Sequence, residues 1–135
     1  MAKTPEEALA LHVRAIGDNR VVRMADTIHL PFQHHSTDGK VVFQYDTPDD
    51  VPEYMEVWNP GWAGSSCELL ESSVILASDV KAAYRVLARR FNADGTPMQD
   101  FEAIYTLLIK DGDWRVISRN PVSYTHLTLP TTVSV

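Results

Sequence analysis

The chain has 135 residues, of which 44% are hydrophobic and 22% charged, and its formal net charge is −6. This length and composition are typical of one soluble globular domain with a core that needs no crosslinks. The single cysteine, Cys67, excludes an internal disulfide and a cysteine-based zinc cluster. We expect a cytoplasmic protein without a secretory signal, a membrane span or a nucleic-acid partner, because no long apolar run is present and negative charge repels phosphate.

Two helices are predicted at the N-terminus. The segment Thr4-Pro5-Glu6-Glu7 can form a capping box with proline in the first turn, which favours a helix start. Leu9, Val13 and Ile16 follow at helical spacing, and Gly17-Asp18-Asn19 ends the pattern. A second short helix is predicted over 20–28, with an apolar stripe of its own.

A strand pair and a third helix are predicted next. Pro31 favours extended backbone, and residues 32–35 and 41–45 flank a turn centred on Asp38-Gly39, which indicates a hairpin. The third helix is predicted from about Asp49 to Trp62. Its aromatic stripe, Tyr54, Trp58 and Trp62, fits either a buried core or the mouth of a pocket.

The second half predicts strands over 68–77, 81–92, 99–110 and 114–119, joined by short turns rich in Asp and Gly. Consecutive strands with such short connections favour an antiparallel meander. The predicted domain covers residues 1–121.

The C-terminal residues 122–135 are expected to be a non-native tail. The string from Val122 to Thr131 resembles one reading frame through a transposase-type sequencing-library adapter. The alternative is a genuine edge strand, since its Thr, Tyr, Leu and Val residues have β character.

Helices followed by a strand pair, a helix and a long-stranded meander resemble the NTF2-like superfamily, within its SnoaL-like branch. The segments that carry the resemblance are Ile28-His29-Leu30-Pro31-Phe32, Tyr105, and Lys110 through Ile117 with its Asp-Gly-Asp-Trp-Arg sequence. The resemblance implies an α+β cone, with three helices packed on a strongly curved antiparallel sheet and a pocket at the open end. Members of this superfamily include isomerases, cyclases, dehydratases and hydrolases, and also non-catalytic association modules, so the fold alone does not give the activity.

Histidines near the junction of the second helix and the first strand are candidate acid–base residues. The imidazole pKa lies near neutral pH, and His29 and His34 lie close to where catalytic members place such a residue. Asp26, three residues before His29, could orient its ring if both lie on one helix. Strand alternation predicts that His34 faces inward if Phe32 does. No metal site is expected, because His34 and the adjacent His35 face opposite ways.

Further candidates lie on the predicted long strands. Arg85 and Arg89 share one face of their strand and could aim a guanidinium into the pocket, or could pair with carboxylates on an exposed face. Glu102 on the next strand is a candidate partner for an arginine, and Tyr105 a candidate pocket hydroxyl. Phe32, Trp58 and Trp62 complete the predicted apolar lining.

Two functions remain open from the sequence. One is a cofactor-independent isomerase, cyclase, dehydratase or hydrolase for a small apolar or aromatic molecule, with His29 or His34 as the base and Tyr105 or an arginine as the oxyanion partner. The other is a non-catalytic ligand-binding or dimerisation module. Apolar residues on both faces of the long strands favour a homodimer in either case.

Overall fold

The computed structural model describes residues 2–17, 21–40, 42–53 and 60–126. Within these, one α-helix and six strands occur, together with short 3₁₀ turns: α1 (Pro5–Ala15), η1 (Met24–Thr27), β1 (Ile28–His35), β2 (Val42–Tyr45), η2 (Pro48–Asp50), η4 (Pro60–Trp62), β3 (Ser66–Ala77), β4 (Lys81–Phe91), β5 (Pro97–Lys110) and β6 (Asp113–His126). No helix in these ranges is both long and apolar enough to traverse a lipid bilayer.

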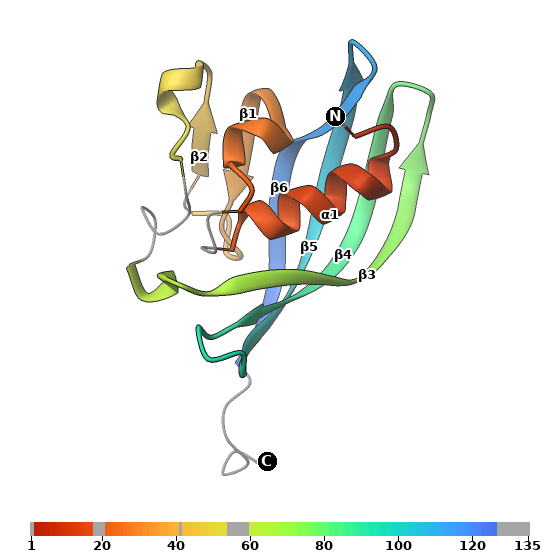
Figure 1. The fold of residues 1–135 in the computed structure, drawn as a ribbon. Helices are drawn as coiled ribbons and strands as arrows, with labels where there is room; N and C mark the ends of the chain where they lie inside the picture. The colour runs from red at the N-terminus through yellow and green to blue at the C-terminus, as the bar shows by residue number, and fades with distance from the viewer. Residues whose placement is uncertain (1, 18–20, 41, 54–59, 127–135) are drawn as a thin grey trace.

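The six strands form one curved sheet in the order β2-β1-β6-β5-β4-β3, with α1 lying against its concave face (Figure 1). Neighbouring strands are antiparallel except for β1 and β6, which run parallel. The predicted hairpin of β1 and β2 and the predicted β3–β6 meander are both confirmed. The α+β class and the curved sheet are confirmed with them, although the sheet is antiparallel only in part, since β1 and β6 run parallel.

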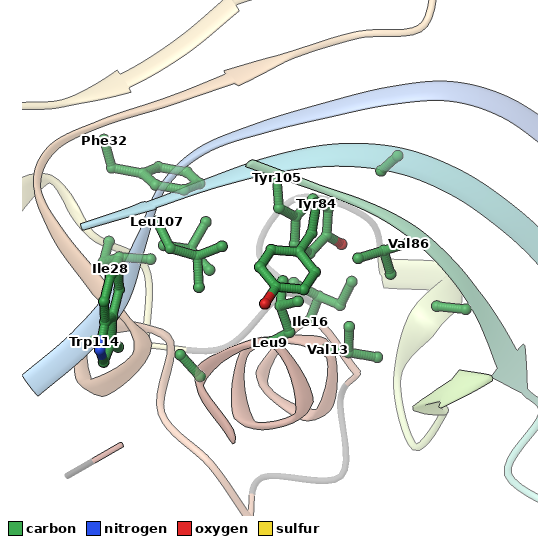
Figure 2. Close-up of a cluster of buried hydrophobic side chains, with 14 of the residues drawn as sticks. Leu9, Val13, Ile16, Ile28, Phe32, Tyr84, Val86, Tyr105, Leu107 and Trp114 are labelled. Atoms are coloured by element: carbon green, nitrogen blue, oxygen red, sulfur yellow. The ribbon is translucent and has the colours of Figure 1, made fainter. Parts of the chain in front are cut away.

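Helix α1 begins as its sequence predicts and packs through one apolar face. Thr4 accepts a hydrogen bond from the main-chain N–H of Glu7, which caps the first turn. Leu9, Val13 and Ile16 are fully buried, and they meet side chains of β4 and β5 in the core cluster that Figure 2 shows.

Gly17, directly after α1, lies tightly against strand β3. A Cβ at this position would stand 2.7 Å from the main-chain nitrogen of Cys67 and 2.9 Å from the Cα of Ser66. These atoms belong to the backbone and have little freedom to move, so only glycine allows the end of the helix to approach the strand this closely. Cys67 is buried at the same place, as a small core residue.

The turn between β5 and β6 shows how the sequence sets the register of the meander. Its two residues, Asp111 and Gly112, have φ values of 53° and 75°. Two central residues with positive φ make a type I′ turn, for which Asp-Gly is a preferred sequence. The turn pairs Lys110 with Asp113 and so starts the long β5–β6 ladder.

The prediction of three helices is wrong in the described residues, which contain one α-helix. At the predicted second helix, only the 3₁₀ turn η1 forms, because Ile28 already pairs with Val116 as the first residue of β1. Sheet pairing here overrides the helical spacing.

The predicted third helix stops after η2, where Thr47 and Asp50 form a capping box. Val51 is extended, with ψ of 121°, since the following Pro52 disfavours helical backbone in its neighbour and lacks an N–H to continue the ladder. Tyr54 and Trp58 lie outside the described residues.

The last strand extends beyond the predicted Arg119 to His126, and its end pairs with the start of β5 from Glu102↔Ser123 to Gln99↔His126. Residues 122–126 thus have strand backbone. The non-native origin of residues 122–135 stays a prediction.

Candidate functional site

A row of aromatic and charged side chains crosses the concave face of the sheet perpendicular to the strands. Cross-strand pairing places Phe43 (β2) beside His34 (β1), His34 beside Arg119 (β6), Arg119 beside Tyr105 (β5), and Tyr105 beside Tyr84 (β4). We call these five residues the transverse row. Because the pairs are direct neighbours in register, their side chains share one face and lie within contact range.

Arg119 is the charged centre of the transverse row. Its side chain is only 3% exposed, although it carries a permanent positive charge. Nε donates to the Tyr105 hydroxyl at 3.2 Å, Nη1 donates to His34 Nδ1 at 2.9 Å, and the guanidinium carbon lies 5.6 Å from the centre of the Phe101 ring. Hydrogen bonds to strands on both sides therefore hold this guanidinium in one position.

The contact with Arg119 determines the protonation of His34. A guanidinium only donates hydrogen bonds, so His34 Nδ1 accepts and the ring hydrogen resides on Nε2. Burial, the charge of Arg119 and the neighbouring His35 lower the pKa of His34 to about 3. At neutral pH His34 is consequently an uncharged ring with an N–H donor at Nε2, which makes it a weak base. Its ring stacks on Phe43 at 5.8 Å.

His12, in the last turn of α1, packs against Tyr105 of the transverse row and is fully buried. Its ring centroid is 5.5 Å from that of Tyr105, edge to face, and 6.0 Å from that of Phe32. Burial, followed by the charge of Arg119, holds the pKa of His12 well below its usual range. Nδ1 bonds to the Thr27 hydroxyl at 2.9 Å, while Nε2 has no hydrogen-bond partner in the described chain. A buried polar atom without a hydrogen bond lowers the free energy of unfolding by about 1–3 kcal/mol.

Three of the residues singled out from the sequence thus meet on the concave face. His34 and Phe32 both point inward, as strand alternation predicted, and Tyr105 is fully buried beside them. Phe32 stacks on Tyr45, at 5.8 Å between ring centroids. The roles of these residues in binding or catalysis stay predictions.

His29 and Asp26 are not part of this group. His29 is half-buried, and its Nε2 donates to the main-chain carbonyl of Asp113 at 2.8 Å. Asp26 is exposed in η1, and the change to strand at Ile28 removes the helical spacing on which their pairing depended. His29 lines a separate surface groove of about 280 Å³, together with Pro48, Val51 and Arg115.

Arg85 and Arg89 lie on the opposite, convex face. Each forms an ion pair across to β5, Arg85 with Glu102 and Arg89 with Asp100, the latter at 2.6 Å from Nε to Oδ1. Of the two arrangements predicted for these arginines, the structure thus has the second, ion pairing on an exposed face. Glu102, the predicted partner, pairs with Arg85. The structure does not bring either arginine to the transverse row.

Trp62 meets an arginine that the sequence analysis did not single out. Arg90 is 1% exposed and lies with its guanidinium carbon 3.9 Å from the centre of the Trp62 ring. It donates to Ser65 Oγ and to the main-chain oxygen of Ile16, both at 2.8 Å. Arg90 thereby binds the C-terminal end of α1, where carbonyls lack helical partners.

Sequence reasoning missed His12, Arg119 and Thr27. A signal for His12 was present: it follows Leu9 by three residues and precedes Ile16 by four, so it belongs to the buried stripe of α1. Arg119 lies five residues after the buried Trp114, an odd offset that would place it on the opposite face of a regular strand, and a register irregularity in β6 changes this count. Thr27 gave no signal, because its partner is distant in sequence.

The part of the chain that the structure describes contains no group of three or more His, Cys, Asp or Glu side chains placed to hold a metal ion. The donor set of the transverse row agrees with this, since a guanidinium at its centre repels a cation.

Comparison with known proteins gave matches of structure alone, since no family model and no curated sequence matched the chain. An NTF2-like protein from Prochlorococcus sp. NATL2A superposes with a TM-score of 0.61 over 97% of this chain and 98% of its own, at 16% identity. A protein with a cystatin-like fold from Nostoc punctiforme gives 0.61 over 90% and 93%, at 12% identity.

The fold is NTF2-like. A putative calcium/calmodulin-dependent protein kinase II association domain from Xanthomonas campestris shares it, with a TM-score of 0.52 over 82% of this chain and 77% of its own, at 18% identity. An NTF2-like fold supports many unrelated activities, so the site must be interpreted from its own residues.

Proposed function

We propose that the protein is a small-molecule-binding domain of the SnoaL-like branch, which holds an apolar or aromatic molecule against the transverse row. The observation that carries the proposal is that His34, Arg119 and Tyr105 come from three adjacent strands and are buried together on the concave face. A few fixed polar groups among aromatic side chains are the usual composition of a ligand site.

The same arrangement supports a class of reaction. Arg119, with Tyr105 at its Nε, can stabilise an enolate or other oxyanion, and such stabilisation is a large part of catalysis in cofactor-independent isomerases, cyclases, dehydratases and hydrolases. His34 does not act as the base in this proposal, because burial and the charge of Arg119 lower its pKa to about 3. The proposal requires no cofactor and no metal.

A ligand screen by thermal shift tests the proposal. Compounds that stabilise the wild type should lose their effect in His34→Gln, which removes the ring contact with Arg119 and Phe43. His35→Gln is the matched control, because its side chain lies on the other face of the same strand. Equal ligand-induced shifts in the wild type and both variants would contradict the proposal.

A second candidate function is a non-catalytic association module. It is favoured by exposed apolar residues at the far end of the β3–β4 hairpin, where Val74, Ile75, Leu76 and Val80 are between 55% and 75% exposed. A patch of this kind favours a homodimer. Light scattering at micromolar concentration should give twice the monomer mass, and Leu76→Asp should halve it. Val21→Asp, at another exposed apolar position, is the control.

A further inference from the structure

A groove of about 580 Å³ lies at the turn end of the β3–β4 hairpin, where β3 forms the outer edge of the sheet (Figure 1). Its volume is within the range of about 300–1,000 Å³ that is usual for ligand sites. The apolar part of its lining comes from Leu76, Ala77, Ala82 and Ala83. We call it the hairpin groove, and it contains no residue of the transverse row.

Strand register explains why the sheet is hollow at this place. Ala83 pairs with Leu76 on β3 and with Thr106 on β5, so these three side chains form one cross-strand row. Ala83 precedes Arg85 by two residues, which places the row on the convex face. The methyl group of Ala83 thus stands between two larger side chains and leaves a depression over the middle strand. Leu76 is 75% exposed, so this apolar surface is open to a ligand.

Lys81 supplies the positive charge of the hairpin groove. It is exposed, and it lies two residues before Ala83 on the same face. Within the described ranges its ammonium group makes no hydrogen bond or ion pair, although the chain carries a net charge of −6. Arg85 and Arg89 on the same strand each have a carboxylate partner. Lys81 therefore places an uncompensated positive charge beside an apolar hollow.

The Thr106 hydroxyl adds a hydrogen-bond donor near this charge. Thr106 pairs with Ala83, so Lys81 and Thr106 are diagonal neighbours on the convex face, at a distance that a long side chain spans. Among the residues that the structure describes, the Thr106 hydroxyl has no hydrogen-bond partner. Ser78 Oγ, in contrast, donates to the main-chain oxygen of Lys81 inside the turn. An ammonium group and a hydroxyl group together match the two oxygens of a carboxylate.

We propose that the hairpin groove binds an amphipathic carboxylate, such as a medium-chain fatty acid. Its chain lies along Leu76 and Ala83, and its carboxylate contacts Lys81 and Thr106. Charge complementarity selects this occupant, because a neutral ligand leaves the Lys81 charge without a partner and a cationic ligand is repelled. The inference goes beyond the proposed function, since it concerns the convex face and requires no ligand at the transverse row.

Octanoate, octan-1-ol and octylammonium test the proposal, because they carry a negative, a neutral and a positive head group on the same eight-carbon chain. Calorimetric titration of the wild type should give octanoate about tenfold tighter binding than octanol, and octylammonium the weakest. Lys81→Gln should lower the octanoate affinity to that of octanol and leave octanol unchanged. Lys40→Gln, at an exposed lysine before β2, is the matched control and should bind as the wild type.

A second pair of variants and a resonance measurement locate the ligand. Ala83→Leu fills the hollow and should weaken octanoate and octanol alike, by about tenfold. Ala83→Ser keeps the size of the side chain and should bind both as the wild type does. In nuclear magnetic resonance spectra of the wild type, octanoate should shift the amide resonances of Ala83 and Thr106 and leave those of His34 and Arg119 in place.

The outcomes separate this inference from the proposed function. Octanoate-induced shifts at His34 and Arg119 instead of the hairpin groove would overturn the inference and support a ligand on the concave face. Equal affinities for octanoate and octanol would also overturn it, because Lys81 would then not recognise the carboxylate. Octanoate binding that weakens as the protein concentration rises would show that a second copy covers Leu76, and no binding at millimolar octanoate would likewise contradict the proposal.

Discussion

Arg89 and Arg90 are neighbours in the chain but lie on opposite faces of β4, and they differ in every contact. Arg89 on the convex face pairs with Asp100, whereas Arg90 on the concave face binds Ser65, the end of α1 and the Trp62 ring. Arg119 on β6 repeats the inner pattern, and Arg85 repeats the outer one. The face of the sheet, which strand alternation sets, therefore decides whether an arginine binds groups in the interior or forms a surface ion pair.

The largest expected effect comes from removing an inner arginine. Arg90→Ala leaves Ser65 Oγ and the Ile16 carbonyl without their donor and should lower the free energy of unfolding by about 3 kcal/mol. Arg89→Ala is the matched control and should change the free energy of unfolding much less, because the side chain and its partner Asp100 are both partly exposed and water can replace their contact. Urea denaturation of the wild type, Arg90→Ala and Arg89→Ala measures the free energies of unfolding. Equal midpoints for the two variants would contradict a difference between the two faces of the sheet.

A moderate effect is expected from the inner histidine next to Arg119. Folding lowers the pKa of His34 from 6.5 to about 3, so between these values the unfolded chain binds a proton that the folded chain does not. The free energy of unfolding should therefore fall as pH falls from 6.5 toward 3, by at most about 1.4 kcal/mol per pH unit for this group. Above pH 6.5 the ring is uncharged in both the folded and the unfolded chain, so His34 adds no pH dependence to the free energy of unfolding. His12, whose pKa is also lowered, acts in the same direction.

His34→Gln should flatten this dependence, whereas His35→Gln should leave its slope near that of the wild type. Denaturation series at several pH values between 3 and 7 check the difference. An unchanged slope in His34→Gln would show that the ring is as accessible to protons as one on the outer face.

The smallest effect is expected on the convex face. A double-mutant cycle on Arg85 and Glu102, with Arg85→Ala, Glu102→Ala and the pair, should give a coupling of about 0.5 kcal/mol that disappears in 1 M salt. A coupling of several kcal/mol would mean that the outer pairs are held as rigidly as the inner ones.

The meander could be predicted from the sequence because its turns carry strong local signals. Asp111-Gly112 at the β5–β6 turn and Asp38-Gly39 at the first hairpin define the ends of strands by residues whose preferred backbone needs no tertiary partner. The absence of the second and third predicted helices could not be predicted in this way. Ile28 joins the sheet because it pairs with Val116, and Pro52 ends the third helix at its first turn.

The candidate site could be predicted in part. Alternation along β1 was enough to place Phe32 and His34 together, because a single inward residue fixes the others on a regular strand. Arg119 and His12 depended on a register irregularity in β6 and on which helix face meets which strand. Both are properties of the assembled fold, and a spacing pattern within one element does not contain them.

Strand β4 binds α1 at both of its ends. Near the start of the helix, the Tyr84 hydroxyl donates to Glu6, and burial together with this bond raises the pKa of Tyr84 to about 12, so the donor stays protonated. At the other end, Arg90 holds the Ile16 carbonyl. His12 lies between these two contacts on the same helix. The depth of its imidazole in the core is therefore set by α1 and strand β4, and a rearrangement of the surrounding loops does not change it.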